Sequence, residues 1–308
     1  MTRIQGLKAL TLMTFTISAT TTLFGQANVI KVDSQKARLT QVGALPKILK
    51  EASGLEISHG KYLWSHNDDG IPAVYCLDTL GNIIRAIHIN ASNRGWEDLA
   101  MNESGDMFIG SFGNNANNRR DLKIFKIANP EAVGESMTIP DIISFSYSDQ
   151  KAFPPAIGNR NFDVDASFAW RGFLYLFTKN RSKPFHSISK IYKLTQEPGQ
   201  QTAQLIDSLQ LGEGPMINNW ITGADLSPDQ KTLALLFHDR VWFIRNFHEN
   251  KFSEGDIYEI PLNHYSHKAG ISFMTNDVIY IVDELAFGVI GGKVYTLDVT
   301  FLWRETEK

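Results

Sequence analysis

The stretch ASGLEI at residues 52–57 opens the pattern that decides the fold. Three more short runs follow it in order, KYLW (61–64), AVYCLD (73–78) and IIRAIHI (83–89). Short apolar or alternating runs that are separated by Gly, Asn, Asp and Ser are typical of β-strands joined by turns. The stretch 52–89 therefore predicts a unit of four strands.

The same order of runs recurs along the rest of the chain. The later copies begin at WEDLA (96–100), FDVDA (162–166), TGADL (222–226) and AGISF (269–273). Repetition of such units is typical of a β-propeller, in which four-stranded sheets, the blades, stand around an axis.

The last copy has only three runs, and the strand-like run 37–45 has no unit of its own. An N-terminal strand that completes the last blade would close the ring and leave no blade edge open. The sequence thus predicts an all-β propeller of five four-stranded blades, closed by its N-terminal strand. A sixth blade within 129–162 is the alternative.

Composition excludes some functions. The 308 residues are 43% hydrophobic and 20% charged, with a formal net charge of −3, which is ordinary for a globular domain. No strong basic field exists to hold a phosphate backbone, so nucleic acid is not an expected partner. Cys76 is the only cysteine, so we expect a small buried apolar residue and no disulfide within the chain. We expect one propeller domain over 28–308, acting as a monomer.

Residues 1–27 are typical of a cleaved export signal. Arg3 and Lys8 give a positive start, 9–24 carry no charge and are apolar or small, and 25–27 (GQA) fit the small-x-small pattern before a cleavage site. A membrane anchor is the alternative, but the run is short and rich in threonine for a stable span. We expect a secreted or periplasmic protein with no transmembrane span after cleavage.

The repeat also predicts where a site lies. In a propeller the first strand of each blade lines the central channel, and the turn after the second strand opens at the same end. The predicted channel residues are Glu51, Glu97, Asp98, Asp163, Asp165, Asp225 and Lys268. The predicted rim residues are His66, Asn67, Asp68, Asn114, Lys179, His238, Asp283 and Glu284. Because Glu97 aligns with Glu51 in the first unit and Lys268 in the last, we expect Glu97 to face the axis with Lys268 beside it as a counter-charge.

Several carboxylates on one axis cannot all ionise without a cation, shared protons or lysines. An oxygen-rich set of this kind suits Ca²⁺, and Glu97, Asp98 and Asp165 are the candidate ligands. The alternative is that these acids cap turns or accept hydrogen bonds from nearby backbone N–H groups. No Gly-x-Ser-x-Gly elbow and no Gly-Lys-Ser/Thr phosphate loop occurs, so no catalytic mechanism is evident.

The first two units resemble secreted bacterial propellers of the SdiA-regulated and phytase-like (esterase-like) group. The shared residues are Ser53-Gly54-Leu55, Trp64-x-x-Asn67-Asp68 and Tyr75-x-Leu77-Asp78-x-x-Gly81. The pair WEDLA (96–100) and GSFGNN (110–115) is similar to uncharacterised members of this group.

A fainter likeness is to the five-bladed calcium-activated nucleotidases, whose second blade is similar to 96–113. That family has a glutamate before the last Gly-Ile pair, at the place that Lys268 takes here, and this difference argues against a calcium-dependent hydrolase.

Three functions follow as hypotheses. The first is an exported propeller that binds a small polar or anionic ligand, a small molecule or a glycan, at its axial channel, with or without calcium. The second is a metal-dependent phosphoesterase of the phytase or nucleotidase kind. The third is a glycan hydrolase that uses paired carboxylates.

Overall fold

The computed structural model describes residues 29–33, 37–134 and 137–304. The helical segments are short: η1 (Lys47–Leu49), η2 (Ile157–Asn159), η3 (Met216–Asn218), η4 (Phe252–Glu254) and α1 (Thr300–Arg304). Over the described ranges, no helix has the length and apolar character that a membrane crossing requires. The export signal predicted at 1–27 lies outside the described residues.

The strands fall into groups of four, and apart from β2 the members of each group follow one another in the chain. The first three groups, in spatial order, are β3 (Ala52–Ser58), β4 (Tyr62–Asn67), β5 (Ala73–Leu77) and β6 (Ile83–His88); β7 (Trp96–Met101), β8 (Met107–Ser111), β9 (Lys123–Ile127) and β10 (Asp141–Tyr147); and β11 (Asp163–Trp170), β12 (Phe173–Lys179), β13 (Ile188–Thr195) and β14 (Gly199–Gln210). The next groups are β15 (Gly223–Leu226), β16 (Thr232–Leu236), β17 (Arg240–Arg245) and β18 (Asp256–Pro261), and then β19 (Lys268–Phe273), β20 (Val278–Asp283), β23 (Lys293–Asp298) and β2 (Leu39–Ala44). Within these groups every neighbouring pair is antiparallel, β2 with β23 included.

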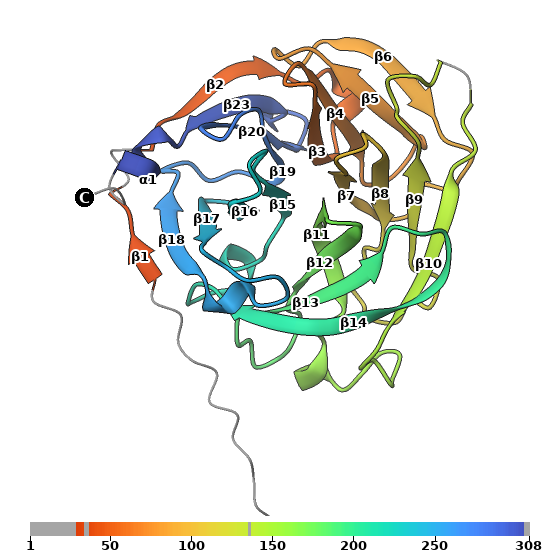
Figure 1. The fold of residues 1–308 in the computed structure, drawn as a ribbon, viewed down its shortest axis with the longest axis vertical. Helices are drawn as coiled ribbons and strands as arrows, with labels where there is room; N and C mark the ends of the chain where they lie inside the picture. Colours follow the sequence, from red (N-terminus) through yellow and green to blue (C-terminus); the bar gives the residue numbers. More distant parts are fainter. Residues whose placement is uncertain (1–28, 34–36, 135–136, 305–308) are drawn as a thin grey trace, which may run out of the picture.

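The groups stand around a common axis (Figure 1). Strands β3, β7, β11, β15 and β19 lie innermost, each contacts the next, and β19 contacts β3. The first strand of every predicted unit therefore lies at the centre. The protein is nearly all β, and its architecture is that of a β-propeller.

The hydrophobic core lies between neighbouring sheets. One cluster packs Phe168 and Tyr175 of the third group against Trp242 of the fourth. Another joins Leu55 of the first group to Val282 of the last. Full burial of a large apolar side chain contributes about 1.5–3 kcal/mol, so face-to-face packing of the sheets supplies much of the stability. Cys76 is buried in such a cluster, as expected.

The structure contains pairings that the sequence pattern did not predict. Strand β1 (Val29–Lys31) adds in parallel to β18, and β10 pairs in parallel with β14, which joins two groups into one eight-stranded sheet. A small hairpin, β21 (Leu285–Ala286) with β22 (Ile290–Gly291), follows β20. The stretch 129–162, considered for a sixth blade, holds β10 and η2 in its described part.

Candidate functional site

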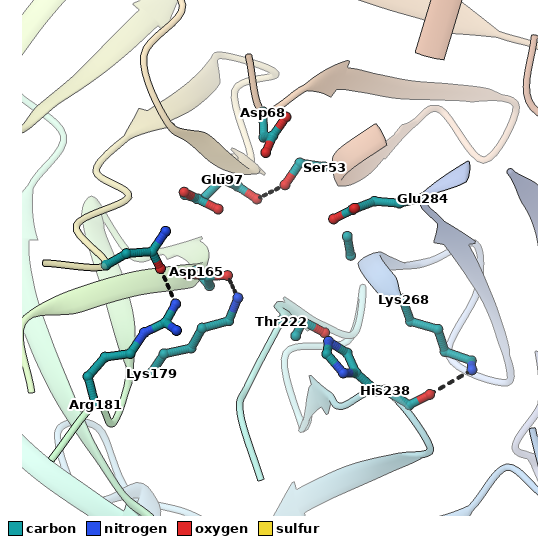
Figure 2. Close-up of a pocket in the computed structure, with 12 residues that line it drawn as sticks. Ser53, Asp68, Glu97, Asp165, Lys179, Arg181, Thr222, His238, Lys268 and Glu284 are labelled. Atoms are coloured by element: carbon teal, nitrogen blue, oxygen red, sulfur yellow. Dashed lines mark hydrogen bonds and ion pairs between the residues drawn. The ribbon is translucent and has the colours of Figure 1, made fainter. Parts of the chain in front are cut away.

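A cavity of about 320 Å³ opens at the end of the propeller where the innermost strands begin and the second strands end. Side chains from every group of strands line it, as Figure 2 shows. The lining residues are Ser53, Asp68, Glu97, Asn115, Asp165, Lys179, Arg181, Thr222, His238, Lys268, Ala269 and Glu284. The volume is at the lower end of the range for small-molecule sites.

β-Bulges direct several of these side chains into the cavity. In β7, Trp96 pairs with Ser111 and Asp98 with Gly110, so Glu97 is an extra, unpaired residue. Asp165 is the extra residue of β11, and Ala269 that of β19. A bulge interrupts the alternation of the strand and re-aims the side chain at that point. Three innermost strands therefore present their bulged residue to one space.

Gly113 makes room for the Glu97 carboxylate. A Cβ atom at residue 113 would lie 1.8 Å from Oε1 of Glu97. No such contact is sterically allowed, so any larger residue at 113 would displace the carboxylate.

Lys268 does not lie beside Glu97, which corrects the expectation from sequence. Its Nζ donates to the carbonyl oxygens of His238 and His264 at 2.8 and 2.9 Å and to Oγ of Ser266 at 3.1 Å. Figure 2 shows the ammonium group turned away from Glu97. Burial lowers the pKa of Lys268 to about 8.

The physical reason for that error is the register of the bulges. Lys268 pairs with the end of β20 as Trp96 pairs with the end of β8, so Ala269 and not Lys268 is the counterpart of Glu97. The cation that acts on Glu97 is Lys179, from β12.

The two other cations of the cavity are already paired with acids. Lys179 forms an ion pair with Asp165. Arg181 donates to Oδ2 of Asp163 at 2.7 Å and to Oδ1 of Asn115, and its guanidinium lies 4.1 Å from the ring centre of Trp220. Burial lowers the pKa of Lys179, although Glu97 and Asp163 oppose this. Neither cation therefore offers an uncompensated charge.

The opposite wall carries acids that lack such pairing. Burial raises the pKa of Glu97 to about 7; Lys179 opposes the rise, and Asp163 and Asp68 add to it. Burial also raises the pKa of Glu284 to about 7, with Asp68 as the largest charge acting in the same direction. The pKa of Asp68 is raised by burial and by Glu51. Three carboxyl groups thus repel one another across one cavity.

Two buried polar atoms of the lining have no hydrogen-bond partner within the described part of the chain. They are Oδ1 of Asp68 and Nδ1 of His238. His238 is 8% exposed, and its ring stacks on that of His267 with ring centres 5.2 Å apart. Burial, with Lys179 next, lowers the pKa of His238 to about 3, so the ring is neutral near pH 7. A buried polar atom without a partner is costly, and a ligand could supply the missing bond.

Seven of the fifteen predicted channel and rim residues line this cavity, and the rest lie outside its lining. The lining set is Asp68, Glu97, Asp165, Lys179, His238, Lys268 and Glu284; the others are Glu51, His66, Asn67, Asp98, Asn114, Asp163 and Asp225. Asp283, also predicted at the rim, accepts hydrogen bonds from the backbone N–H of Lys293 and from the Tyr295 hydroxyl.

Several of the residues outside the lining hold the loops at this end. Asn67 donates to Ile48 O at 2.7 Å and accepts from the backbone N–H of Glu51. Asn114 accepts from the backbone N–H groups of residues 118 and 119. His66 is fully buried and contacts Trp96 edge-to-face. The Glu51 side chain pairs with Lys50 at 3.1 Å.

Asp98 and Asp225 tie neighbouring innermost strands together. Asp98 accepts from the backbone N–H of Ser167 in β11 at 2.6 Å, and Asp225 accepts from that of Phe273 in β19 at 2.7 Å. Glu56 does the same for Met101 in β7 at 2.9 Å. Burial raises the pKa of all three carboxyl groups. Asp98 and Asp225 therefore have the structural role that was the alternative to a ligand site: they accept hydrogen bonds from nearby backbone N–H groups.

The donor set does not fit a calcium ion held jointly by Glu97, Asp98 and Asp165. Both oxygens of Asp98 accept backbone hydrogen bonds, from Leu99 and Ser167, and Asp165 is paired with Lys179. In the described ranges, no three His, Cys, Asp or Glu side chains converge closely enough to hold a metal ion. Calcium needs six to eight oxygen ligands at 2.3–2.6 Å.

Arg181, Thr222, Ser53, Asn115 and Ala269 line the cavity but were not among the candidates. Arg181 stands two residues after Lys179, just past a second strand, so the rule for the rim could have found it. The others are small or neutral, and a search for charged residues passes over them.

Comparison with known proteins supports the fold. The PQQ-bound form of aldose sugar dehydrogenase from Streptomyces coelicolor is similar with a TM-score of 0.51 and 11% identity, covering 85% of this chain and 98% of that one. A β-propeller domain from Myceliophteria thermophila gives 0.42 and 9%, covering 85% and 100%. A gluconolactonase from Xanthomonas campestris gives 0.44 and 12%, covering 86% and 91%.

The likeness to the sugar dehydrogenase, at 11% identity, shows the fold alone, which is a β-propeller. No protein-family profile matches the chain, and no curated protein matches it. The resemblance to the SdiA-regulated and phytase-like group stays a prediction.

Proposed function

We propose that this chain is an exported β-propeller that binds a small polar ligand in its axial cavity. The observation that carries the proposal is the cavity itself, which is lined by the bulged residues Glu97 and Asp165 and by Asp68 and His238, each of which has a buried polar atom without a partner in the described chain. Charged groups whose pKa values are shifted by burial and that converge in a cleft are a physical signature of functional sites. Export rests on the predicted signal at 1–27.

We further propose that the scaffold is a closed ring of five blades. Contacts of each innermost strand with the next, and of β19 with β3, support the ring. The pairing of β2 with β23 supports closure by the N-terminal strand. Such a ring holds its axial side chains rigidly, because each is fixed by two neighbouring sheets.

Ligand screening of the mature chain, residues 28–308, tests the binding proposal. A ligand of the folded state raises the melting temperature in proportion to RT ln(1 + [L]/Kd). We expect small hydrophilic compounds to stabilise the parent, and Ala269→Phe, which projects a ring into the cavity from a bulge, to abolish the effect. Thr195→Phe, at an exposed position of β13, is the matched control. Equal stabilisation of the parent and Ala269→Phe would place binding elsewhere.

A carboxylate-based glycan hydrolase is the second candidate function. It is favoured by Glu97 and Glu284, which share the cavity. Burial raises the pKa of each to about 7, a value that suits a general acid, while the mechanism requires the second carboxyl group to be ionised. Release of nitrophenol from nitrophenyl glycosides by the parent, lost in both Glu97→Gln and Glu284→Gln, would establish it. Activity that survives both substitutions would exclude this pair.

A further inference from the structure

The charges that remain available in the cavity are negative. Lys179 is paired with Asp165, Arg181 with Asp163, and Lys268 donates to two carbonyl oxygens and a hydroxyl. The cationic side chains are therefore saturated by the protein, and an anionic ligand would have to displace one of these acids.

The acids of the opposite wall have no comparable partners. Oδ1 of Asp68 is buried and unpartnered in the described chain. Oε2 of Glu284 lies 3.8 Å from Nδ1 of His267. Glu97 is influenced by Lys179, but that ammonium group is bound to Asp165. In Figure 2, Asp68 and Glu97 lie along the top of the view and Glu284 at its right, with Lys179 and Arg181 at the lower left.

His238 gives an independent sign that a ligand belongs here. The residue is 8% exposed, it lines the cavity, and its Nδ1 is buried without a partner among the described residues. The ring is neutral near pH 7, so it matches a hydroxyl or amide and not a charge. Thr222, beside it in Figure 2, adds a hydroxyl of its own.

We infer that the ligand is a small hydroxylated amine, whose ammonium group lies among Asp68, Glu97 and Glu284 and whose polar body reaches His238 and Thr222. The inference rests on the proposed binding function and narrows it. An ammonium group has three N–H donors, and its charge relieves the repulsion among three carboxylates. Among the described residues these acids do not converge closely enough to hold a metal ion. The ammonium group would instead lie in the field of all three carboxylates without contacting each of them.

The test uses two probes of nearly the same shape. Tris carries three hydroxymethyl groups and an ammonium group on one carbon, and pentaerythritol carries a fourth hydroxymethyl group in place of the ammonium. Isothermal titration and melting curves of residues 28–308 would be recorded at about pH 7.5 in phosphate-free buffer. Inorganic phosphate and CaCl₂ are the other arms. We expect saturable binding of Tris in the millimolar range and none of pentaerythritol at equal concentration.

Variants locate the interaction. Glu284→Gln and Asp68→Asn keep the shape of each side chain and remove its charge, so each should weaken Tris binding about tenfold or more. Asp141→Asn, at an exposed position of β10, should leave it unchanged. Glu284 is partly exposed, with 33% of its side chain accessible, so its amide variant should fold even if the others do not.

The outcomes separate the two proposals. Equal binding of Tris and pentaerythritol, or binding of phosphate that is lost in Lys179→Met, would overturn the amine while leaving a polar-ligand site in place. Calcium binding that competes with Tris would show that the ligand of the site is a metal ion and not an amine. Failure of Tris to bind the parent would overturn the amine, whereas the axial binding site is overturned only if the wider ligand screen also finds no stabilising compound.

Discussion

Replacing Asp225 by asparagine should change how the stability of the protein depends on pH. Asp225 is 9% exposed and accepts hydrogen bonds from the backbone N–H groups of Leu226 and Phe273, both at 2.7 Å, and from Ser272 Oγ at 3.0 Å. Burial nevertheless raises its pKa from 3.8 to about 7. A carboxyl group with a raised folded-state pKa stabilises the fold at low pH, and this contribution is lost as the pH rises through about 7.

The shift sets the size of the effect. A rise from 3.8 to about 7 is about 3.2 pKa units, and at about 1.36 kcal/mol per unit it amounts to at most about 4 kcal/mol between pH 4 and pH 8. Asparagine does not titrate, but it keeps only one acceptor oxygen, so it loses about 1–3 kcal/mol of hydrogen bonding at every pH. The variant should therefore be less stable than the parent at pH 4, and its stability should approach or exceed that of the parent at pH 8.

Urea unfolding of the parent and of Asp225→Asn at several pH values from 4 to 8 measures this difference. Asp141→Asn, at an exposed site, controls for the addition of an amide. A difference in unfolding free energy that stays constant with pH would show that Asp225 titrates normally. If the unfolding free energy of the variant falls relative to that of the parent as the pH rises, the folded protein stabilises the carboxylate form.

Other perturbations probe the ring, the site and export. A chain that starts at Pro46 lacks β2 and exposes β23 as an edge, so it should be lost from the soluble fraction of a lysate, whereas a chain that starts at Ala37 should remain. Gly113→Ala should displace Glu97 and abolish ligand-induced stabilisation without unfolding the protein. Lys268→Met leaves buried acceptors unpaired and should lower the unfolding free energy by about 1–3 kcal/mol in urea. Mass spectrometry of protein from its host should find an N-terminus near residue 26 or 28, and an intact N-terminal methionine would indicate an anchor.

Much of the fold could be predicted from local pattern. Strands such as 61–64 and 73–78 carry apolar and aromatic residues between turn residues, and that signal depends on neighbours in the chain. The repeat placed 52–57 and 96–100 on the axis, because the same kind of run opens each unit. The parallel pairing of β10 with β14 was not predictable, since it joins outer strands whose contact depends on how two sheets stand in space.

What the sequence by itself determined is the propeller pattern and the end of the axis at which charged residues gather. Alternation could not tell whether Glu97 or Asp98 faces the cavity. Alignment of the units favoured Glu97, but only the tertiary structure gives the reason: the bulge aims Glu97 inward, while Asp98 accepts the N–H of Ser167 in β11. The same holds for Lys268, whose ammonium group turns to His264 and Ser266. A bulge depends on the pairing of two strands, and the neutralisation of a charge depends on groups far away in the chain. Neither can be deduced from the spacing of residues within one strand.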